Sequence, residues 1–84
     1  MVLNALGHEY VVEFKVYSSD FKFKKGKKQV AYYAKNRGLK EAYYVVFVAK
    51  KHEQKKAIIQ ETEEEVKGIA VKTFLIWYDE NKDF

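Results

Sequence analysis

The chain has 84 residues, with no cysteine and two histidines. This length corresponds to a single small domain, residues 1–84. The absence of cysteine excludes disulfides, thiol catalysis, cysteine-ligated zinc and iron–sulfur clusters. Apolar residues make up 48% of the sequence, which is above the range of disordered proteins. No apolar run approaches the ~20 residues that span a bilayer, and no signal peptide opens the chain, so we expect a cytoplasmic domain without a membrane partner.

Positive charge is concentrated in one part of the sequence. The formal net charge of the whole chain is +4, yet residues 15–40 contain eight lysines and one arginine against a single acid, Asp20. Four glutamates, in contrast, lie within residues 61–65. A basic segment of this kind suits a polyanion such as DNA or RNA. A solvated lysine surface on a small protein would have the same composition, so charge alone leaves both interpretations open.

The first part of the chain predicts a β-hairpin. Val2–Ala5 is a short apolar run, and Glu9–Ser18 alternates between apolar and polar residues and is rich in β-formers. A tight turn at Leu6–Gly7 would pair Ala5 with His8, which fixes the register of the two strands.

A helix is predicted after this hairpin. Residues 21–28 predict a lysine-rich connection whose phenylalanines, Phe21 and Phe23, pack on the body of the domain. Between Lys25 and Arg37 the apolar residues recur at helical spacing, and Gly38 lies where a helix commonly ends. We therefore expect a helix over Lys25–Arg37.

The second half of the chain predicts three strands. Ala42–Ala49 is a continuous apolar run, typical of a strand that is covered on both faces. Ile58–Val66 and Ile69–Tyr78 flank Lys67–Gly68 and predict a second hairpin. Because glutamate is a poor strand former, residues 61–67 are alternatively a helical turn.

Together these elements predict an α/β domain in the order strand, strand, helix, strand, strand, strand. A helix that connects two strands of one sheet implies that these strands are parallel, which gives a mixed sheet of about five strands with one principal helix. One helix covers only one face of such a sheet. We therefore expect a homodimer in which a partner covers the second face.

Two pairs of residues could carry chemistry. Glu13 and Lys15 lie two residues apart in the long predicted strand, so they share one face of the sheet. The carboxylate can hold a divalent cation, and the lysine can orient a water or stabilise charge on a phosphate. On the predicted helix, Gln29 and Tyr33 are four residues apart and also share a face. Taken singly, each pair is more typical of a surface salt bridge or of an ordinary half-buried helix face.

The order of these motifs resembles the PD-(D/E)XK nuclease superfamily. Residues 12–17 read hydrophobic-Glu-Phe-Lys-Val-Tyr, the helix carries Gln-x-x-x-Tyr, and residues 39–47 read Leu-x-x-Ala-Tyr-Tyr-Val-Val-Phe. The combination lies within Tyr10–Val48. It is most similar to the RecB-like branch and to the nuclease-type domains at the C-termini of predicted ATPases. This resemblance implies a restriction-endonuclease-like partial core.

The resemblance also implies roles for the four residues singled out above. Glu13 and Lys15 correspond to the acid and the lysine of the family motif. Gln29 and Tyr33 correspond to helix residues that place the nucleic-acid end or the water of the metal site. These four would be vestigial or incomplete catalytic residues if the metal site lacks a ligand.

The metal site of the family needs a further aspartate, on the strand that precedes the Glu-x-Lys motif. Only twelve residues precede Glu13, and none of them is aspartate. Asn4 is the polar candidate, but the predicted register places it opposite Glu9. Because one carboxylate rarely holds Mg²⁺, we expect an incomplete metal site at Glu13 and no cofactor for this chain alone. Mg²⁺ would bind if a missing segment or a partner chain supplied the acid.

Three functions follow from these observations. The first is nucleic-acid binding, to DNA or RNA, by a truncated relative of these nucleases that does not cleave by itself. Its phosphate-binding residues would be the basic side chains on and around the predicted helix: Lys22, Lys24, Lys25, Lys27, Lys28 and Arg37. The second is a non-enzymatic dimeric interaction module. The third is a magnesium-dependent nuclease that another segment completes.

Overall fold

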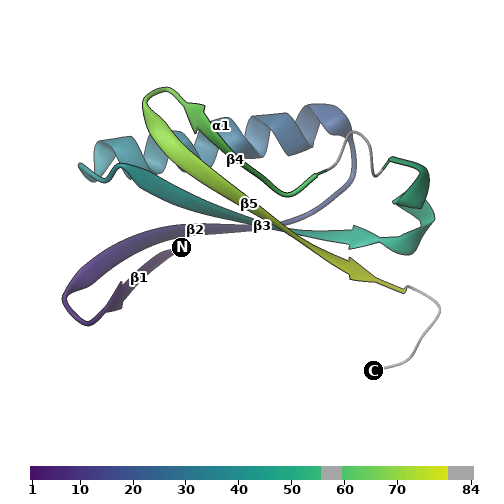
Figure 1. Ribbon diagram of the computed structural model, residues 1–84, viewed down its shortest axis with the longest axis horizontal. Helices are drawn as coiled ribbons and strands as arrows, with labels where there is room; N and C mark the ends of the chain where they lie inside the picture. Colours follow the sequence, from purple (N-terminus) through teal and green to yellow (C-terminus); the bar gives the residue numbers. More distant parts are fainter. Residues whose placement is uncertain (56–59, 80–84) are drawn as a thin grey trace.

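A computed structural model describes residues 1–55 and 60–79 as a five-stranded sheet with one long helix on one of its faces (Figure 1). The elements in chain order are β1 (Val2–Ala5), β2 (His8–Val16), α1 (Asp20–Asn36), β3 (Glu41–Ala49), the short 3₁₀ helix η1 (Lys50–Lys55), β4 (Thr62–Val66) and β5 (Ile69–Tyr78). In space the strands follow the order β1-β2-β3-β5-β4. The three central strands are mutually parallel, and β1 and β4 pair antiparallel at the two edges. The predicted α/β class, with a mixed sheet and one principal helix, is confirmed.

Both hairpins form as the sequence predicts. Ala5 pairs with His8 across the first turn, and Leu6 and Gly7 both have positive φ, 51° and 80°. Lys67 and Gly68 repeat this geometry, with φ of 53° and 82°. Two consecutive residues with positive φ match the handed twist of the flanking strands, and glycine adopts this conformation without strain. The segment before the second turn is a strand rather than a helical turn. This strand starts at Thr62, later than the predicted Ile58: residues 60–61 are not in a strand, and residues 58–59 lie outside the described part of the chain.

Helix α1 begins at Asp20, which is earlier than the sequence predicts. Ser19 caps it: its Oγ accepts a hydrogen bond from the N–H of Lys22 at 3.2 Å, and Asp20 places a negative charge in the first turn. Both features stabilise a helix start. The expected lysine-rich connection is therefore helical from its first residue. Of its two phenylalanines, Phe23 packs in the core as expected, but Phe21 is 74% exposed.

The C-terminal end of α1 agrees with the prediction. Gly38 has a φ of 71° and follows the last turn. The N–H of Leu39 donates to the carbonyl of Ala34 at 2.9 Å, and Gly38 N–H donates to Lys35 at 3.0 Å. This double closure is the Schellman arrangement, which a glycine at that position favours. Among the described residues, no helix is long and apolar enough to cross a membrane.

The hydrophobic core lies between α1 and the sheet. The helix contributes a stripe of buried residues at helical spacing: Phe23, Gly26, Val30, Ala31 and Ala34. The sheet contributes fully buried residues from strands β3 and β5: Ala42, Tyr44, Val46, Val48 and Val71. Aliphatic burial of this kind contributes about 25 cal/mol for each Å² of apolar surface removed from water.

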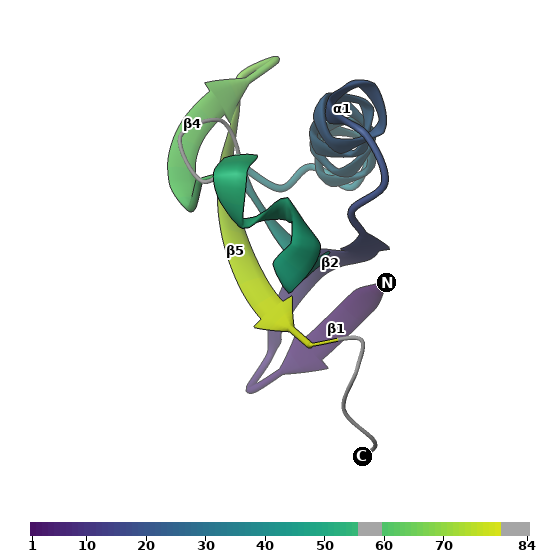
Figure 2. The same cartoon turned by 90° about the vertical axis from the view of Figure 1, so that its right-hand side faces the viewer.

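Strand β3 is covered on one face only, which corrects the expectation of cover on both. Its residues alternate between buried positions under α1 and half-buried positions on the opposite face, such as Val45 and Phe47. The continuous apolar run arose because both faces of the strand are apolar, not because both are enclosed. Figure 2 shows α1 on one side of the sheet.

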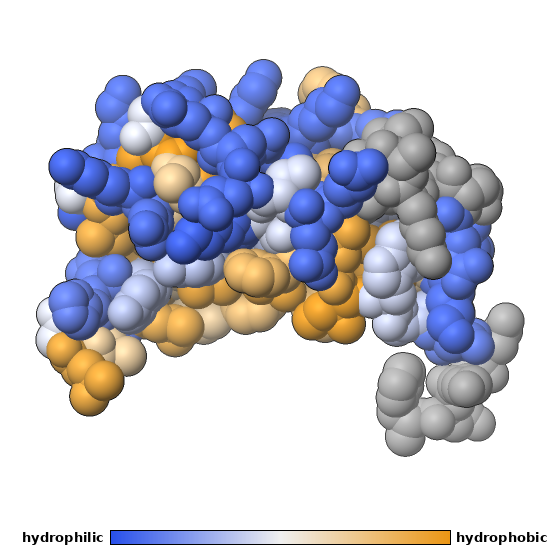
Figure 3. All heavy atoms as spheres, in the orientation of Figure 1, coloured by the Kyte–Doolittle hydropathy of each residue, from blue (hydrophilic) through white to orange (hydrophobic). Residues whose placement is uncertain are grey.

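The face of the sheet opposite α1, called the open face below, carries exposed apolar side chains. Neighbouring strands contribute Leu3, Phe14, Val16, Phe74 and Ile76, each between 43% and 64% exposed. In Figure 3 hydrophilic residues gather over α1 and hydrophobic residues along the underside of the molecule. The two sides of the molecule therefore differ in their exposed residues: the surface of α1 is hydrophilic, and the open face is apolar.

Candidate functional site

The Glu-x-Lys motif lies on an interior strand and faces α1. Strand β2 is paired on both sides, with β1 and with β3. Glu13 pairs with Tyr44, and Lys15 pairs with Val46. Because Tyr44 and Val46 are buried under the helix and paired residues share a face, Glu13 and Lys15 also point to the helix side. The predicted common face is confirmed.

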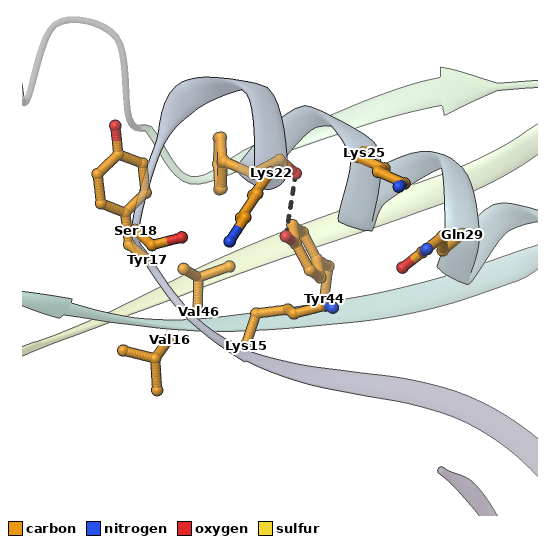
Figure 4. Close-up of a pocket in the computed structure, with 10 residues that line it drawn as sticks. Lys15, Val16, Tyr17, Ser18, Lys22, Lys25, Gln29, Tyr44 and Val46 are labelled. Carbon is orange, nitrogen blue, oxygen red and sulfur yellow. Dashed lines mark hydrogen bonds between the residues drawn. The ribbon is translucent and has the colours of Figure 1, made fainter.

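A cavity of about 350 Å³ opens between the end of β2 and the first half of α1. Its polar lining comes from Lys15 on β2, Ser18 before the helix, Lys22, Lys25 and Gln29 on α1, and Tyr44 on β3 (Figure 4). The remaining lining residues are Val16, Tyr17, Phe23 and Val46. Three lysines and no carboxylate are among its lining residues, so the ionised groups that line it are all cationic.

Tyr44 sets the distance between the helix and the sheet at this site. Its hydroxyl donates to the carbonyl oxygen of Phe23 at 3.0 Å, and the side chain is 0% exposed. Burial, and secondarily the charge of Glu13, raise the pKa of Tyr44 to about 12. The phenol therefore stays neutral at physiological pH and remains a hydrogen-bond donor. Gly26 makes the close approach possible, because a Cβ at this position would lie 2.2 Å from the tyrosine oxygen.

Only part of the predicted catalytic set comes together. Gln29 lines the same cavity as Lys15. Tyr33, one turn further along α1, is 56% exposed and does not line this cavity. It lines a shallow hollow on the outer surface that Gln29 also borders, together with Lys25, Lys28 and Lys67 of the second hairpin. Glu13 is half-buried beside Tyr44 and does not line the cavity.

The residues around Glu13 do not fit a magnesium site. Mg²⁺ takes oxygen ligands, usually from more than one group. On this face Glu13 neighbours the ammonium-bearing Lys15 and a tyrosine hydroxyl that already donates to a carbonyl. Asn4 pairs with Glu9, as predicted, rather than with Glu13. Within residues 1–55 and 60–79, no three histidine, aspartate or glutamate side chains are grouped in a way that could hold a metal ion.

Two of the six predicted phosphate-binding residues are neutralised inside the chain. Lys27 Nζ lies 3.0 Å from a carboxylate oxygen of Glu64, and the Lys27 side chain is 13% exposed. Arg37 donates a hydrogen bond to Glu9, which holds the pKa of Glu9 below its usual value. An external anion would have to compete with Glu64 for Lys27, whereas Arg37 is 46% exposed and contacts Glu9 through its Nε.

The other four lysines of this set divide between two flanks of the helix. Lys22 and Lys25 line the cavity with Lys15. Lys24 and Lys28 lie on the flank that faces β4, although Lys28 also shares a shallow hollow with Lys25. These four lysines and Lys15 are exposed, and none of them is in an ion pair within the described residues.

Sequence reasoning missed the part played by Tyr44 and Gly26. A signal was present, because a glycine inside a helix costs about 1 kcal/mol relative to alanine and so indicates a close approach of another group. Its partner could not be named from spacing, since Tyr44 belongs to a strand 18 residues away.

No family model, curated protein or solved structure matches this chain. The resemblance to PD-(D/E)XK nucleases therefore stays a prediction.

Proposed function

We propose that this protein binds nucleic acid through the basic surface of α1, and that the chain alone does not cleave it. The observation that carries this proposal is the set of unpaired lysines on both flanks of the helix, beside a cavity that no carboxylate lines. Two acids outside the helix, Glu9 and Glu64, are paired with Arg37 and Lys27. What remains on the helix is an excess of positive charge that suits a phosphate backbone.

The length of the basic segment limits how many phosphates it contacts. Lys22 and Lys28 are six residues apart, which is about 9 Å along a helix that rises 1.5 Å per residue. Phosphates of one strand follow each other every ~3.4 Å along a duplex axis, so the segment spans about three of them. Each neutralised phosphate contributes about 0.7–0.9 to the log–log salt slope, and the whole slope should be about −2 to −3.

The test is a titration of a labelled duplex and a labelled single strand at several salt concentrations. Exchanging Lys24 and Lys28 for glutamine should flatten the slope, because both ammonium groups face solvent. The matched variant Lys27→Gln should leave the slope nearly unchanged, because its ammonium is paired with Glu64. If neither nucleic acid binds at low salt, nucleic-acid binding is ruled out.

Cleavage is tested in the same samples. With Mg²⁺ added, the labelled strands should stay intact, because the residues around Glu13 do not fit a magnesium site. Magnesium-dependent cleavage that disappears in Glu13→Gln would establish the nuclease alternative instead.

A dimeric interaction module is the second candidate, favoured by the open face. Exposed apolar patches larger than a few hundred Å² usually mark association, and a two-fold dimer is the commonest closed form. The variants Phe74→Lys and Ile76→Lys place charge on the open face, while Phe21→Lys is a control on the exposed side of α1. Sedimentation should give a dimer for the wild type and the control and a monomer for the open-face variants. A wild-type mass near 9.9 kDa would exclude the dimer.

A further inference from the structure

We propose that the outer edge of β1 pairs with the same edge of a second copy of this chain, so that two sheets join across a two-fold axis. Among the described residues, β1 pairs with β2 alone and leaves its other side open (Figure 1). This inference does not depend on nucleic-acid binding. Its contact is made by the backbone of an edge strand, whereas the dimeric candidate above uses side chains of the open face.

The two edge strands of the sheet differ in charge. An exposed edge offers unpaired N–H and C=O groups to any other strand, and proteins commonly block such pairing with charged side chains. Strand β4 carries three consecutive glutamates, Glu63–Glu65, which would meet like charges in a second copy. Strand β1 consists of four exposed residues without a charge or a proline: Val2, Leu3, Asn4 and Ala5. Of the two edges, that of β1 is therefore the one suited to pairing with itself.

The hydrogen bonds of the first hairpin show which backbone groups point outward. The Met1 ammonium donates to the Val12 carbonyl at 2.7 Å, and the Val12 N–H donates to the Met1 carbonyl at 2.8 Å. In an antiparallel ladder, such a hydrogen-bonded pair alternates with a pair that exchanges no bonds. Leu3, two residues further on, therefore bonds to β2. The N–H and C=O groups of Val2 and Asn4 point to the open edge.

These outward groups match a second copy in antiparallel orientation. When Leu3 lies opposite its equivalent at the axis, Val2 lies opposite Asn4 of the other copy, and the symmetry repeats this pair. Each of the two pairs exchanges two N–H···O=C bonds, which gives about four between the copies. A register centred on Val2 or on Asn4 would give only about two. The favoured register also brings the two Leu3 side chains together on the open face, where directly opposed residues are close neighbours.

The size of the contact sets its strength. Main-chain bonds supply most of the affinity when one strand adds to another. The exposed side chains of Val2 and Leu3, at 40% and 44%, lose part of their contact with water in the pair. A stable interface buries about 800 Å² on each partner, and one four-residue strand buries less. We therefore expect a weak, reversible dimer that requires concentrated protein.

Sedimentation equilibrium from micromolar to millimolar protein measures this association. The wild-type mass should rise from near 9.9 kDa toward twice that value. Asn4→Pro removes an outward N–H from each copy, which eliminates half of the interchain hydrogen bonds, and should weaken the dimer about tenfold or more. Proline is tolerated where the N–H of an edge strand faces solvent. Circular dichroism checks that the variant keeps its fold.

Charge pairs at Leu3 test the register. Leu3→Lys and Leu3→Glu should each abolish the dimer, because like charges would lie directly opposite each other at the axis. An equimolar mixture of the two variants should dimerise again, because the opposed charges then differ in sign. Leu6→Lys is the matched control: it adds the same charge in the adjacent turn, where Leu6 is fully exposed, and should dimerise like the wild type. Lysine already occupies the equivalent turn position at Lys67, with nearly the same φ.

Each other result would overturn the proposal. A wild-type mass that stays near 9.9 kDa at millimolar protein would exclude the edge pairing. Association that Asn4→Pro and Leu3→Lys leave unchanged would place the contact elsewhere, and a mixture of charged variants that stays monomeric would exclude the two-fold register. Phe74→Lys and Ile76→Lys should keep the edge dimer. If these two variants are monomeric, the contact belongs to the open face and not to β1.

Discussion

Replacing Gly26 with alanine should destabilise the protein, although alanine is the better helix former. The gain from helix propensity is about 1 kcal/mol. Against it, the new Cβ would lie 2.2 Å from the Tyr44 oxygen and 2.7 Å from Tyr44 Cζ. The ring has no room to move, because Tyr44 is fully buried and packs against Phe23 with ring centroids 5.7 Å apart. The helix must therefore shift away from the crowded ring, and the shift also breaks the hydrogen bond of the Tyr44 hydroxyl to Phe23.

The expected loss can be worked from these two consequences. Overpacking of a core typically costs about 1–3 kcal/mol. Leaving the buried Tyr44 hydroxyl without a partner costs about 1–3 kcal/mol more. After subtracting the propensity gain, the net destabilisation should be about 3 kcal/mol. For a domain of this size this lowers the melting temperature by roughly 10–25 °C.

Denaturant unfolding followed by circular dichroism measures the effect, with two controls. The variants Lys25→Ala and Lys25→Gly, at the neighbouring exposed position, should differ by the propensity term alone. In the Tyr44→Phe background the contact at 2.2 Å disappears but the contact at 2.7 Å remains, so Gly26→Ala should cost less there. If Gly26→Ala were as stable as the wild type or more stable, the close packing of α1 on Tyr44 would be refuted.

Four further predictions concern single side chains. Thr73 is 2% exposed, and its hydroxyl has no hydrogen-bond partner among the described residues; Thr73→Val should therefore stabilise the protein by about 1 kcal/mol in denaturant unfolding. Burial raises the pKa of Tyr44 to about 12, so the folded state holds this proton more tightly than the unfolded state does. The free energy of unfolding should therefore be constant up to about pH 10 and fall by up to about 3 kcal/mol as the pH rises toward 12. The fall should be smaller in Tyr44→Phe. The hydrogen bond from Arg37 lowers the pKa of Glu9 from 4.5. The Glu9 carboxylate should therefore stabilise the folded protein above pH 4.5 and lose this effect on further acidification. Glu9→Gln should remove that part of the acid dependence in unfolding curves recorded at several pH values. Glu13→Gln should leave nucleic-acid affinity unchanged or raise it in the salt titration, and a marked loss of affinity would show that the carboxylate takes part in binding.

Local chemistry made much of the fold predictable. The turn at Leu6–Gly7 made the register of the first hairpin predictable, because a two-residue turn allows the two strands to pair in only one register. Gly38 marked the end of the helix, since few other residues adopt its φ of 71° without strain. The start of the helix was harder to place. Its first turns are rich in lysine and show little apolar periodicity. The cap depends on the single hydroxyl of Ser19, and a serine at this position is equally typical of a loop after a strand.

The candidate site was less predictable than the fold. Spacing alone placed Glu13 with Lys15 on one face, because strand side chains alternate strictly. Which lysines are available to a ligand depends on long-range pairs, such as Lys27 with Glu64. Such a pair depends on the hairpin of β4 and β5 returning beside the helix, and no local pattern encodes it. The same limit applies to the cavity, which exists only where β2, α1 and β3 meet.

The parallel centre of the sheet has a consequence for how the chain folds. The first hairpin joins residues three apart in sequence, Ala5 and His8. The central pairings join residues much further apart: Val12 with Tyr43, and Glu41 with Ala70. Closing such long loops has an entropic cost that must be met before the contacts form, so pairing of this kind slows folding. The hairpins and the helix can each form locally, whereas assembly of β3 between β2 and β5 sets the folding rate. Variants in β3 should therefore change the rate of folding more than variants in either edge strand.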